Sequence, residues 1–169
     1  MPRYDILHAT PLTSSQHSEF AQAVTEIHTS AFKVPRLFVN VAYTDIASRV
    51  QYIAGKRRDG NHIIAHVRLG NRTRAELQQL SDDIIAAWDR IVVMPHASEG
   101  KAEMRKWGIH SVFILASDAI GSEAGLPVPI AGKEGEFLQS HYGEIKERAD
   151  EGDELMIDMV KEIEERGML

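Results

Sequence analysis

Apolar residues in the first part of the chain fall at helical spacing between two strand-like segments. Steps of four, three and four residues separate the apolar positions Phe20, Val24, Ile27 and Ala31. This spacing places them on one face of a helix. Thr13 and Gln16 form a capping-box pattern that predicts where the helix begins, and Pro35 bounds its end. Residues 3–8 and 37–43 read as strands on either side, so the pattern predicts a β-α-β unit.

The same order of elements recurs about sixty positions later. Residues 62–69 read as a strand, and Thr73 with Glu76 forms a second capping-box pattern. The helix that follows carries one apolar face, formed by Leu77, Leu80, Ile84, Trp88 and Ile91. Pro95 bounds this helix, and residues 111–116 read as the closing strand. The chain therefore repeats the β-α-β unit.

Two tandem units predict an α+β fold, or α/β by strand direction. Right-handed crossovers would place the four strands in one sheet with both helices on one face. We expect a single domain over residues 1–169, with unit one at about 2–45 and unit two at about 61–118. A C-terminal helical extension is expected at about 136–168, where apolar residues keep helical spacing on an acidic background.

Composition excludes several classes of function. With 25 acidic and 19 basic residues among 169, the net charge is −6, which argues against a broad nucleic-acid surface. The absence of cysteine excludes disulfides, thiolate metal sites and a cysteine nucleophile. No apolar run is long enough to span a bilayer and the start lacks a secretory signal, so we expect a soluble, cytoplasmic protein. The uncovered face of the sheet predicts an oligomer.

Pro2 directly after Met1 is a first candidate for chemistry. Removal of Met1 would expose a secondary amine, and an α-amino group titrates at about 7.7 to 8. Such an amine can act as a general base or a general acid. Metal ligation is not expected, because His62 and His66 share a strand face by alternation alone. The run at residues 56–60 reads as a solvated turn rather than an anion clamp.

A cluster of basic residues lies where the second unit passes from strand to helix. His66, Arg68, Arg72 and Arg74 crowd this point, and a helix N-terminus favours an anion. The cluster either binds a carboxylate or merely decorates the helix start. His28, at the edge of the first apolar stripe, and Glu123, in a glycine-flanked loop, have structural interpretations when taken alone.

These residues together resemble those of the tautomerase superfamily. The resemblance rests on the tandem units, Pro2, His28, the stretch at 52–60, His66 and Arg72 in that order. Within the superfamily the chain is most similar to the cis-3-chloroacrylic acid dehalogenase group, whose chains join two units where 4-oxalocrotonate tautomerase has one. The similarity runs from Pro2 to about residue 137.

The resemblance implies roles for particular residues. Pro2 would be the catalytic acid or base, and Arg72, with Arg68 as a companion, would hold the substrate carboxylate. His28 would assist in binding or in orienting water. Glu123, eleven residues before a Glu-Gly-Glu-Phe stretch, would activate water. Phe113 would contact substrate. Phe113 or Val112 stands where the dehalogenases carry a tyrosine, and neither side chain can donate a hydrogen bond.

Three functions follow as hypotheses. The first is a cofactor-independent tautomerase that binds no metal and moves a proton on a small α-keto or unsaturated carboxylate. The second is a hydratase or dehalogenase of 3-haloacrylate-like acids. The third is a non-catalytic binding or scaffold protein that retains Met1. The resemblance also implies a homotrimer, and the composition argues against a nucleic-acid or membrane partner.

Overall fold

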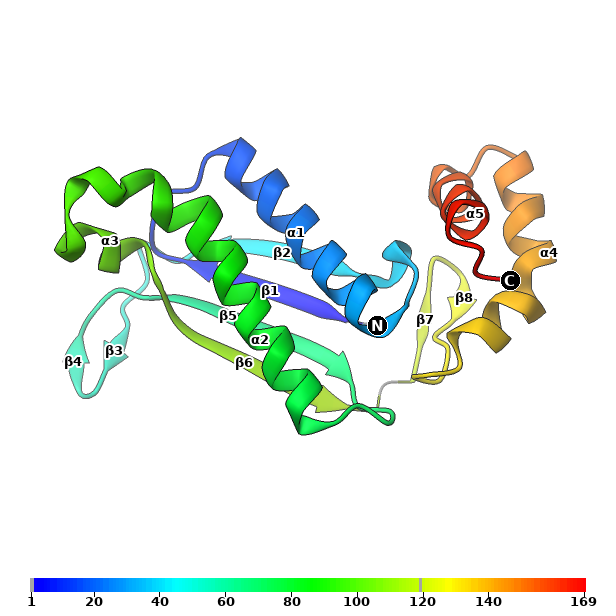
Figure 1. The fold of residues 1–169 in the computed structure, drawn as a ribbon, viewed down its shortest axis with the longest axis horizontal. Coiled ribbons are helices and arrows are strands. Elements are labelled where there is room, and N and C mark those ends of the chain that lie inside the picture. The colour runs from blue at the N-terminus through cyan, green and yellow to red at the C-terminus, as the bar shows by residue number, and fades with distance from the viewer. Residues whose placement is uncertain (1, 119) are drawn as a thin grey trace.

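The computed structural model describes residues 2–118 and 120–169, and its centre is a four-stranded sheet (Figure 1). The strand order is β2-β1-β5-β6, with bounds β1 Arg3–His8, β2 Asn40–Asp45, β5 Asn61–Arg68 and β6 Ile109–Ser117. Within each unit the two strands are parallel, and β1 pairs with β5 in antiparallel register. The predicted α+β fold of two tandem units in one sheet is confirmed.

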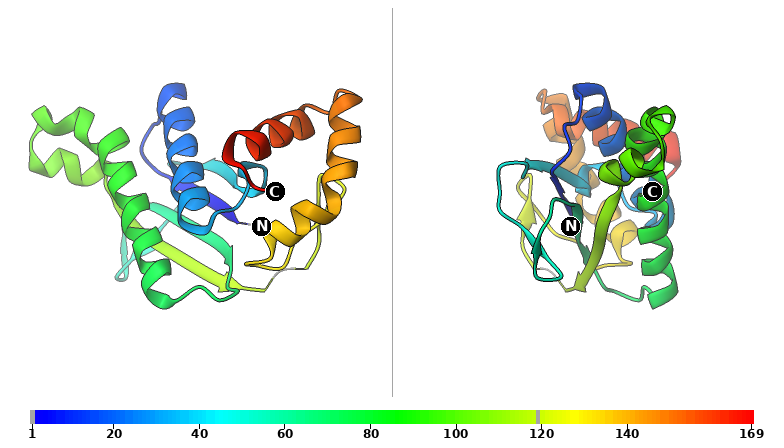
Figure 2. Two further views of the ribbon diagram at one scale, coloured as in Figure 1. Left: turned by 45° about the vertical axis from the view of Figure 1, so that its right-hand side comes forward. Right: turned by 90° about the vertical axis from the view of Figure 1, so that its left-hand side faces the viewer.

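Two helices cover one face of this sheet. They are α1 Ser14–Phe32 and α2 Arg74–Trp88, which lie side by side in Figures 1 and 2. Both predicted capping boxes are present, at Thr13 and at Thr73. The core between helices and sheet is one cluster of buried side chains that includes Phe20, Val24, Leu80, Ile84 and Trp88 from the helices and Tyr4, Ile6, Ile63 and Ala65 from the strands.

The opposite face of the sheet is open within one chain. Phe113, at the centre of β6, is 57% exposed, and Leu115 two residues later is also exposed. Short elements complete the two units: the hairpin strands β3 Tyr52–Ile53 and β4 Lys56–Arg57, the π-helical segment η2 Asp89–Val93, the 3-10 helix η3 Met94–Glu99, and helix α3 Lys101–Trp107. An open apolar face of this kind favours a partner.

The second strand begins later than its composition predicts. Residues 37–43 read as a strand, but Arg36–Phe38 forms a 3-10 turn (η1) and β2 starts at Asn40. Phe38 turns away from the sheet and packs in a second buried cluster, with Phe137, Met156 and other residues of the C-terminal segment. Tertiary packing of one aromatic side chain therefore sets this boundary.

The C-terminal segment lies beyond the end of the sheet where β1 begins (Figure 2). It contains a small hairpin, β7 Ser122–Glu123 with β8 Leu126–Pro127, and two helices, α4 Glu134–Asp150 and α5 Glu154–Arg166. One helical extension is predicted at 136–168, and the structure divides it in two. Gly152 adopts a positive φ of 94°, and the Asp153 side chain then caps α5, so the helix ends and restarts there.

Polar contacts fasten the C-terminal segment to the first unit. The backbone N–H of Arg36 donates to Glu162 at 2.8 Å, and Arg166 donates to the carbonyl of Val34 at 3.3 Å. Glu162 is buried, and Arg166 also pairs with it. None of the helices in the described residues combines the length and the apolar character needed to cross a membrane.

Candidate active site

Pro2 lies at the start of β1, beside the start of β2. Its side chain is buried, and its carbonyl accepts a hydrogen bond of 3.1 Å from the backbone N–H of Asn40. Because side chains alternate along a strand, Pro2 and Tyr4 face the same side of the sheet, which α1 and α2 cover. Met1, whose removal would expose the Pro2 amine, lies outside the described residues.

Tyr4 and His28 form a buried pair on this side. The Tyr4 hydroxyl and His28 Nδ1 share a hydrogen bond of 2.6 Å, and the His28 side chain is 0% exposed. The other ring nitrogen of His28, Nε2, is buried and has no hydrogen-bond partner within the described residues. Burial raises the pKa of Tyr4, so its hydroxyl stays protonated at neutral pH.

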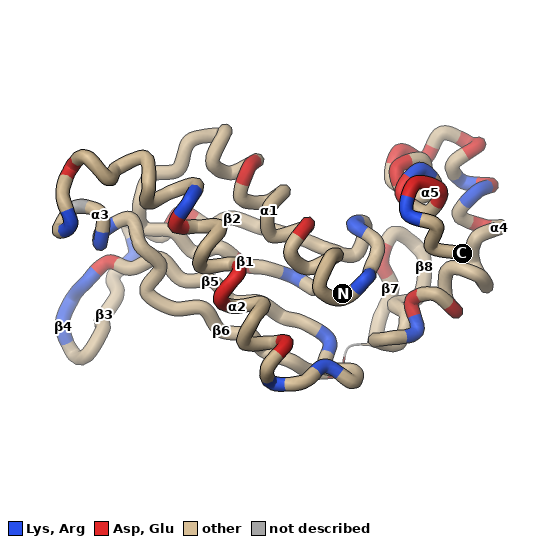
Figure 3. Tube along the Cα trace, viewed as in Figure 1, with Lys and Arg blue, Asp and Glu red and all other residues tan. Residues whose placement is uncertain are grey.

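His28 is held in its neutral form. Burial, and then the positive charges of Arg72, Arg68 and the amino terminus, lower its pKa from 6.5 to about 3. The two arginines act on the imidazole from the loop before α2 and from the end of β5. Figure 3 shows basic positions along this end of the sheet, between the sheet and the C-terminal helices.

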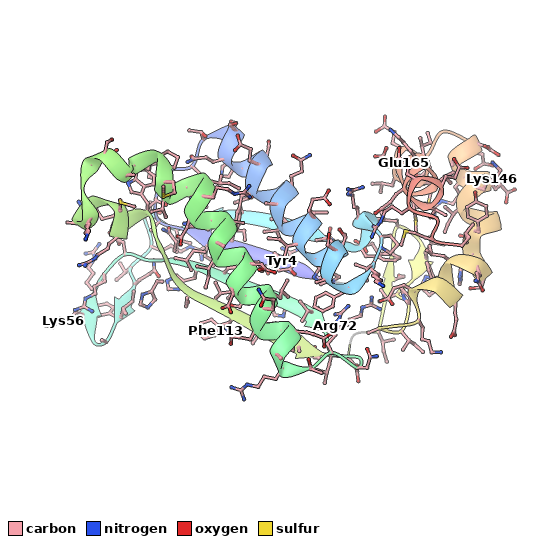
Figure 4. All side chains as sticks on the ribbon, viewed as in Figure 1. Tyr4, Lys56, Arg72, Phe113, Lys146 and Glu165 are labelled. Atoms are coloured by element: carbon pink, nitrogen blue, oxygen red, sulfur yellow. The ribbon has the colours of Figure 1, made fainter. Side chains whose placement is uncertain are left out.

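Arg72 is half-buried in the loop between β5 and α2. Its guanidinium carbon lies 3.9 Å from the centre of the Phe32 ring, and Nη1 donates to the carbonyl of Arg68 at 2.5 Å. Within the described residues no carboxylate pairs with it. Figure 4 places Arg72 at the end of the sheet that faces the C-terminal segment. Burial lowers its pKa, and arginine still remains a cation at neutral pH.

Arg68, unlike Arg72, is fully buried and paired with a carboxylate. It is the last residue of β5 and is 2% exposed. Its Nη2 donates to Glu134 Oε1 at 2.7 Å, and its Nη1 donates to the carbonyl of Pro129. The structure therefore places Arg68 beside Arg72, but commits its two terminal nitrogens to residues of the C-terminal segment, while its Nε is buried without a partner in the described residues.

Glu123 is brought to the same end of the sheet by the β7–β8 hairpin. Asn40 Nδ2 donates to Glu123 Oε1 at 2.8 Å, while Oε2 is buried without a hydrogen-bond partner in the described chain. Asn40 also contacts the Pro2 carbonyl, so it links proline and carboxylate. The sequence reasoning missed Asn40, although an asparagine within an otherwise apolar strand-like run is a signal that could have found it.

Phe113 does not join this cluster within one chain. It lies mid-strand on the open face of the sheet, opposite Ile64 in the β5–β6 register (Figure 4). Its expected contact with substrate stays a prediction.

Both ring nitrogens of His62 take part in hydrogen bonds within the chain. Nδ1 is hydrogen-bonded to Ser111 Oγ and Nε2 to Gln51 Oε1, both at 2.8 Å. Within the described residues no group of three or more potential metal-binding side chains occurs.

The comparisons with known proteins identify the family. A family model described as "Putative oxalocrotonate tautomerase enzyme" matches residues 1–140. The chain belongs to this tautomerase family. No protein of curated function matches the chain in sequence. The match spans both β-α-β units and reaches into α4, so the tautomerase region includes every residue of the site described above.

Solved structures share the tautomerase fold. N1, a member of the cis-3-chloroacrylic acid dehalogenase family, is 21% identical with a TM-score of 0.65, over 88% of this chain and 99% of N1. The F6 fused 4-OT wild-type asymmetric trimer is 13% identical with a TM-score of 0.53, over 74% and 94%. MIF2 of Leishmania major is 15% identical with a TM-score of 0.52, over 76% and 97%. At these identities the likeness shows the fold.

Proposed function

We propose that this tautomerase uses the amine of Pro2, freed by removal of Met1, to move a proton on a small α-keto or unsaturated carboxylate. The observation that carries the proposal is the placement of Pro2. It is buried at the start of β1, on the same side of the sheet as the Tyr4–His28 pair. Arg72, which pairs with no carboxylate in the described residues, acts on His28 of that pair. Burial and nearby positive charge both favour the neutral, basic form of an amine.

Each residue of the site has its own role in the proposed proton transfer. Arg72 binds the substrate carboxylate and stabilises the charge that develops on an enolate. Pro2 takes the proton from the enol oxygen and returns a proton to the neighbouring carbon, so that an O–H bond breaks and a C–H bond forms. In the tautomer in which Nδ1 accepts from the Tyr4 hydroxyl, His28 Nε2 carries the imidazole hydrogen and can donate it to substrate or water. No cofactor enters these steps.

The test is ketonisation of phenylenolpyruvate by the wild type and by Pro2→Ala. Loss of general acid–base catalysis lowers a rate by roughly 10²- to 10⁴-fold. We expect such a loss in Pro2→Ala and little change in Pro11→Ala, which alters an exposed proline. Full turnover by Pro2→Ala refutes the proposal, and a wild-type protein that retains Met1 and turns over no substrate favours a binding or scaffold role.

A second candidate function is hydration or dehalogenation of a 3-haloacrylate-like acid. The observation in its favour is the Glu123 carboxylate, whose Oε1 is fixed by Asn40 and whose Oε2 is buried and unbonded in the described chain. That oxygen would take a proton from water while Pro2 supplies one to the substrate. Glu123→Gln should abolish hydration and spare ketonisation, and equal losses of both activities would argue against a separate water-activating role.

We also propose that the chain assembles as a homotrimer. The open sheet face exposes Phe113 and Leu115, and the fold is shared by a fused 4-OT protein described as an asymmetric trimer. Sedimentation should give the mass of three chains for the wild type and a smaller mass for Leu115→Glu. Gln79→Glu, on the exposed surface of α2, is the control. A monomeric wild type would refute the assembly.

A further inference from the structure

The first residue of α4 reaches into the arginine cluster at the end of the sheet. Glu134 is 6% exposed, and its Oε1 lies 2.7 Å from Arg68 Nη2. Its charge also acts on Arg72, whose pKa it raises against the larger effect of burial. Two arginines and one internal carboxylate therefore lie together, and we call these three residues the Arg68–Arg72–Glu134 cluster.

The two arginines of this cluster are not equivalent. Arg68 is buried and gives one nitrogen to Glu134 and another to the carbonyl of Pro129. Arg72 is half-buried, stacks on Phe32 and pairs with no carboxylate in the described part of the chain. The charge of Arg68 is thus cancelled inside the protein, whereas the charge of Arg72 is not.

An external carboxylate would have to displace Glu134 in order to reach Arg68. Removal of one partner from a buried ion pair strongly destabilises a protein, because the other charge is left buried and uncompensated. Glu134 is also tethered to the chain, so its effective concentration at Arg68 exceeds that of a dilute ligand. A ligand carboxylate therefore meets Arg72 first, and a second carboxylate on the same ligand finds Arg68 occupied and Glu134 repelling it.

We propose that Glu134 is a specificity-determining residue that withdraws Arg68 from carboxylate binding. Arg72 then holds the carboxylate alone, and the site rejects a second negative charge. This inference rests on the proposed function for the position of the binding site. The C-terminal segment thereby takes part in ligand choice. Arg68 does not touch the ligand and acts only by holding Glu134 in place.

Crotonate and fumarate test the proposal directly. They share a four-carbon trans-alkene and differ by a methyl group against a second carboxylate. Calorimetric titration gives the dissociation constant of each ligand and needs no turnover. The wild type should bind crotonate more tightly than fumarate. In Glu134→Gln, fumarate affinity should rise relative to crotonate by roughly tenfold or more, the effect of one charge-assisted hydrogen bond.

Two matched variants distinguish the release of Arg68 from the loss of any nearby negative charge. Glu136→Gln changes a surface glutamate of the same helical turn and should leave the affinity ratio unchanged. Arg68→Gln/Glu134→Gln removes both buried charges, which keeps the protein foldable. The double variant should bind crotonate with the wild-type affinity. Its affinity for fumarate should rise by less than that of Glu134→Gln.

Three results would overturn the inference. They are an unchanged ratio in Glu134→Gln, an equal fumarate gain in the double variant, and loss of crotonate binding in the double variant. The last would show that Arg68 does hold the ligand. Failure of the proposed function is a different result, since it appears as turnover that survives Pro2→Ala, whatever the affinity ratio.

Discussion

The neutral state of His28 makes the stability of this protein depend on pH in a specific way. The His28 side chain is fully buried, and its pKa falls from 6.5 to about 3 in the folded chain. Above pH 6.5 the imidazole is neutral in both the folded and the unfolded state. As the pH falls below that value the unfolded chain binds a proton that the folded chain refuses, so stability is lost until about pH 3.

The size of this loss follows from the two pKa values. Between about pH 7 and about pH 4.5, a shift from 6.5 to about 3 removes roughly 2.5 kcal/mol of the free energy of unfolding. Other acid-titrating groups add their own losses. Replacing His28 by a residue that does not titrate removes the His28 contribution and leaves the others in place.

The assay is urea unfolding of the wild type and His28→Asn at both pH values and one fixed protein concentration. His28→Asn should be less stable at about pH 7, because Tyr4 loses its partner, but it should lose about 2.5 kcal/mol less on acidification. Tyr4→Phe, which breaks the same hydrogen bond but keeps the imidazole, should lose about as much as the wild type on acidification. The reasoning would be refuted if His28→Asn lost as much free energy of unfolding on acidification as the wild type does. It would also be refuted if His28 titrated near its ordinary pKa in an NMR experiment.

Two further predictions concern the site and its support. Asn40→Ala should slow any hydration by roughly tenfold or more, because Glu123 loses a charge-assisted hydrogen bond, while ketonisation changes little; rate assays on both substrates check this. Gly70→Ala should lower the free energy of unfolding by about 1 to 3 kcal/mol in urea titration, because φ is +50° and a Cβ would lie 2.7 Å from that of Ala131. Gly135→Ala in α4 meets nothing within 4 Å, so a loss of equal size there would contradict the explanation.

Local patterns were enough to predict the frame of the fold. The capping boxes at Thr13 and Thr73 each combine a side-chain acceptor and a partner three residues on, so neighbours in sequence determine them. Apolar spacing then identifies the face that each helix buries. The placement of four strands in one sheet, with both helices on one face, follows from the tandem units and the rule for crossovers.

The candidate site was harder to predict because its contacts join distant parts of the chain. Arg68 and Glu134 are 66 positions apart, and Asn40 and Glu123 are 83 apart. No local periodicity reports such pairs. The basic character of the loop before α2 was visible in sequence, but the use of Arg68 as an internal partner depends on where the C-terminal helices pack.

The pH–rate profile of phenylenolpyruvate ketonisation tests the central claim most directly, after mass spectrometry has confirmed a chain that begins at Pro2. If Pro2 is the base, kcat/KM rises with pH through a single pKa in the wild type, and this ascending limb is absent from Pro2→Ala. An ascending limb with the same pKa in both proteins would show that another group moves the proton, and would contradict the account.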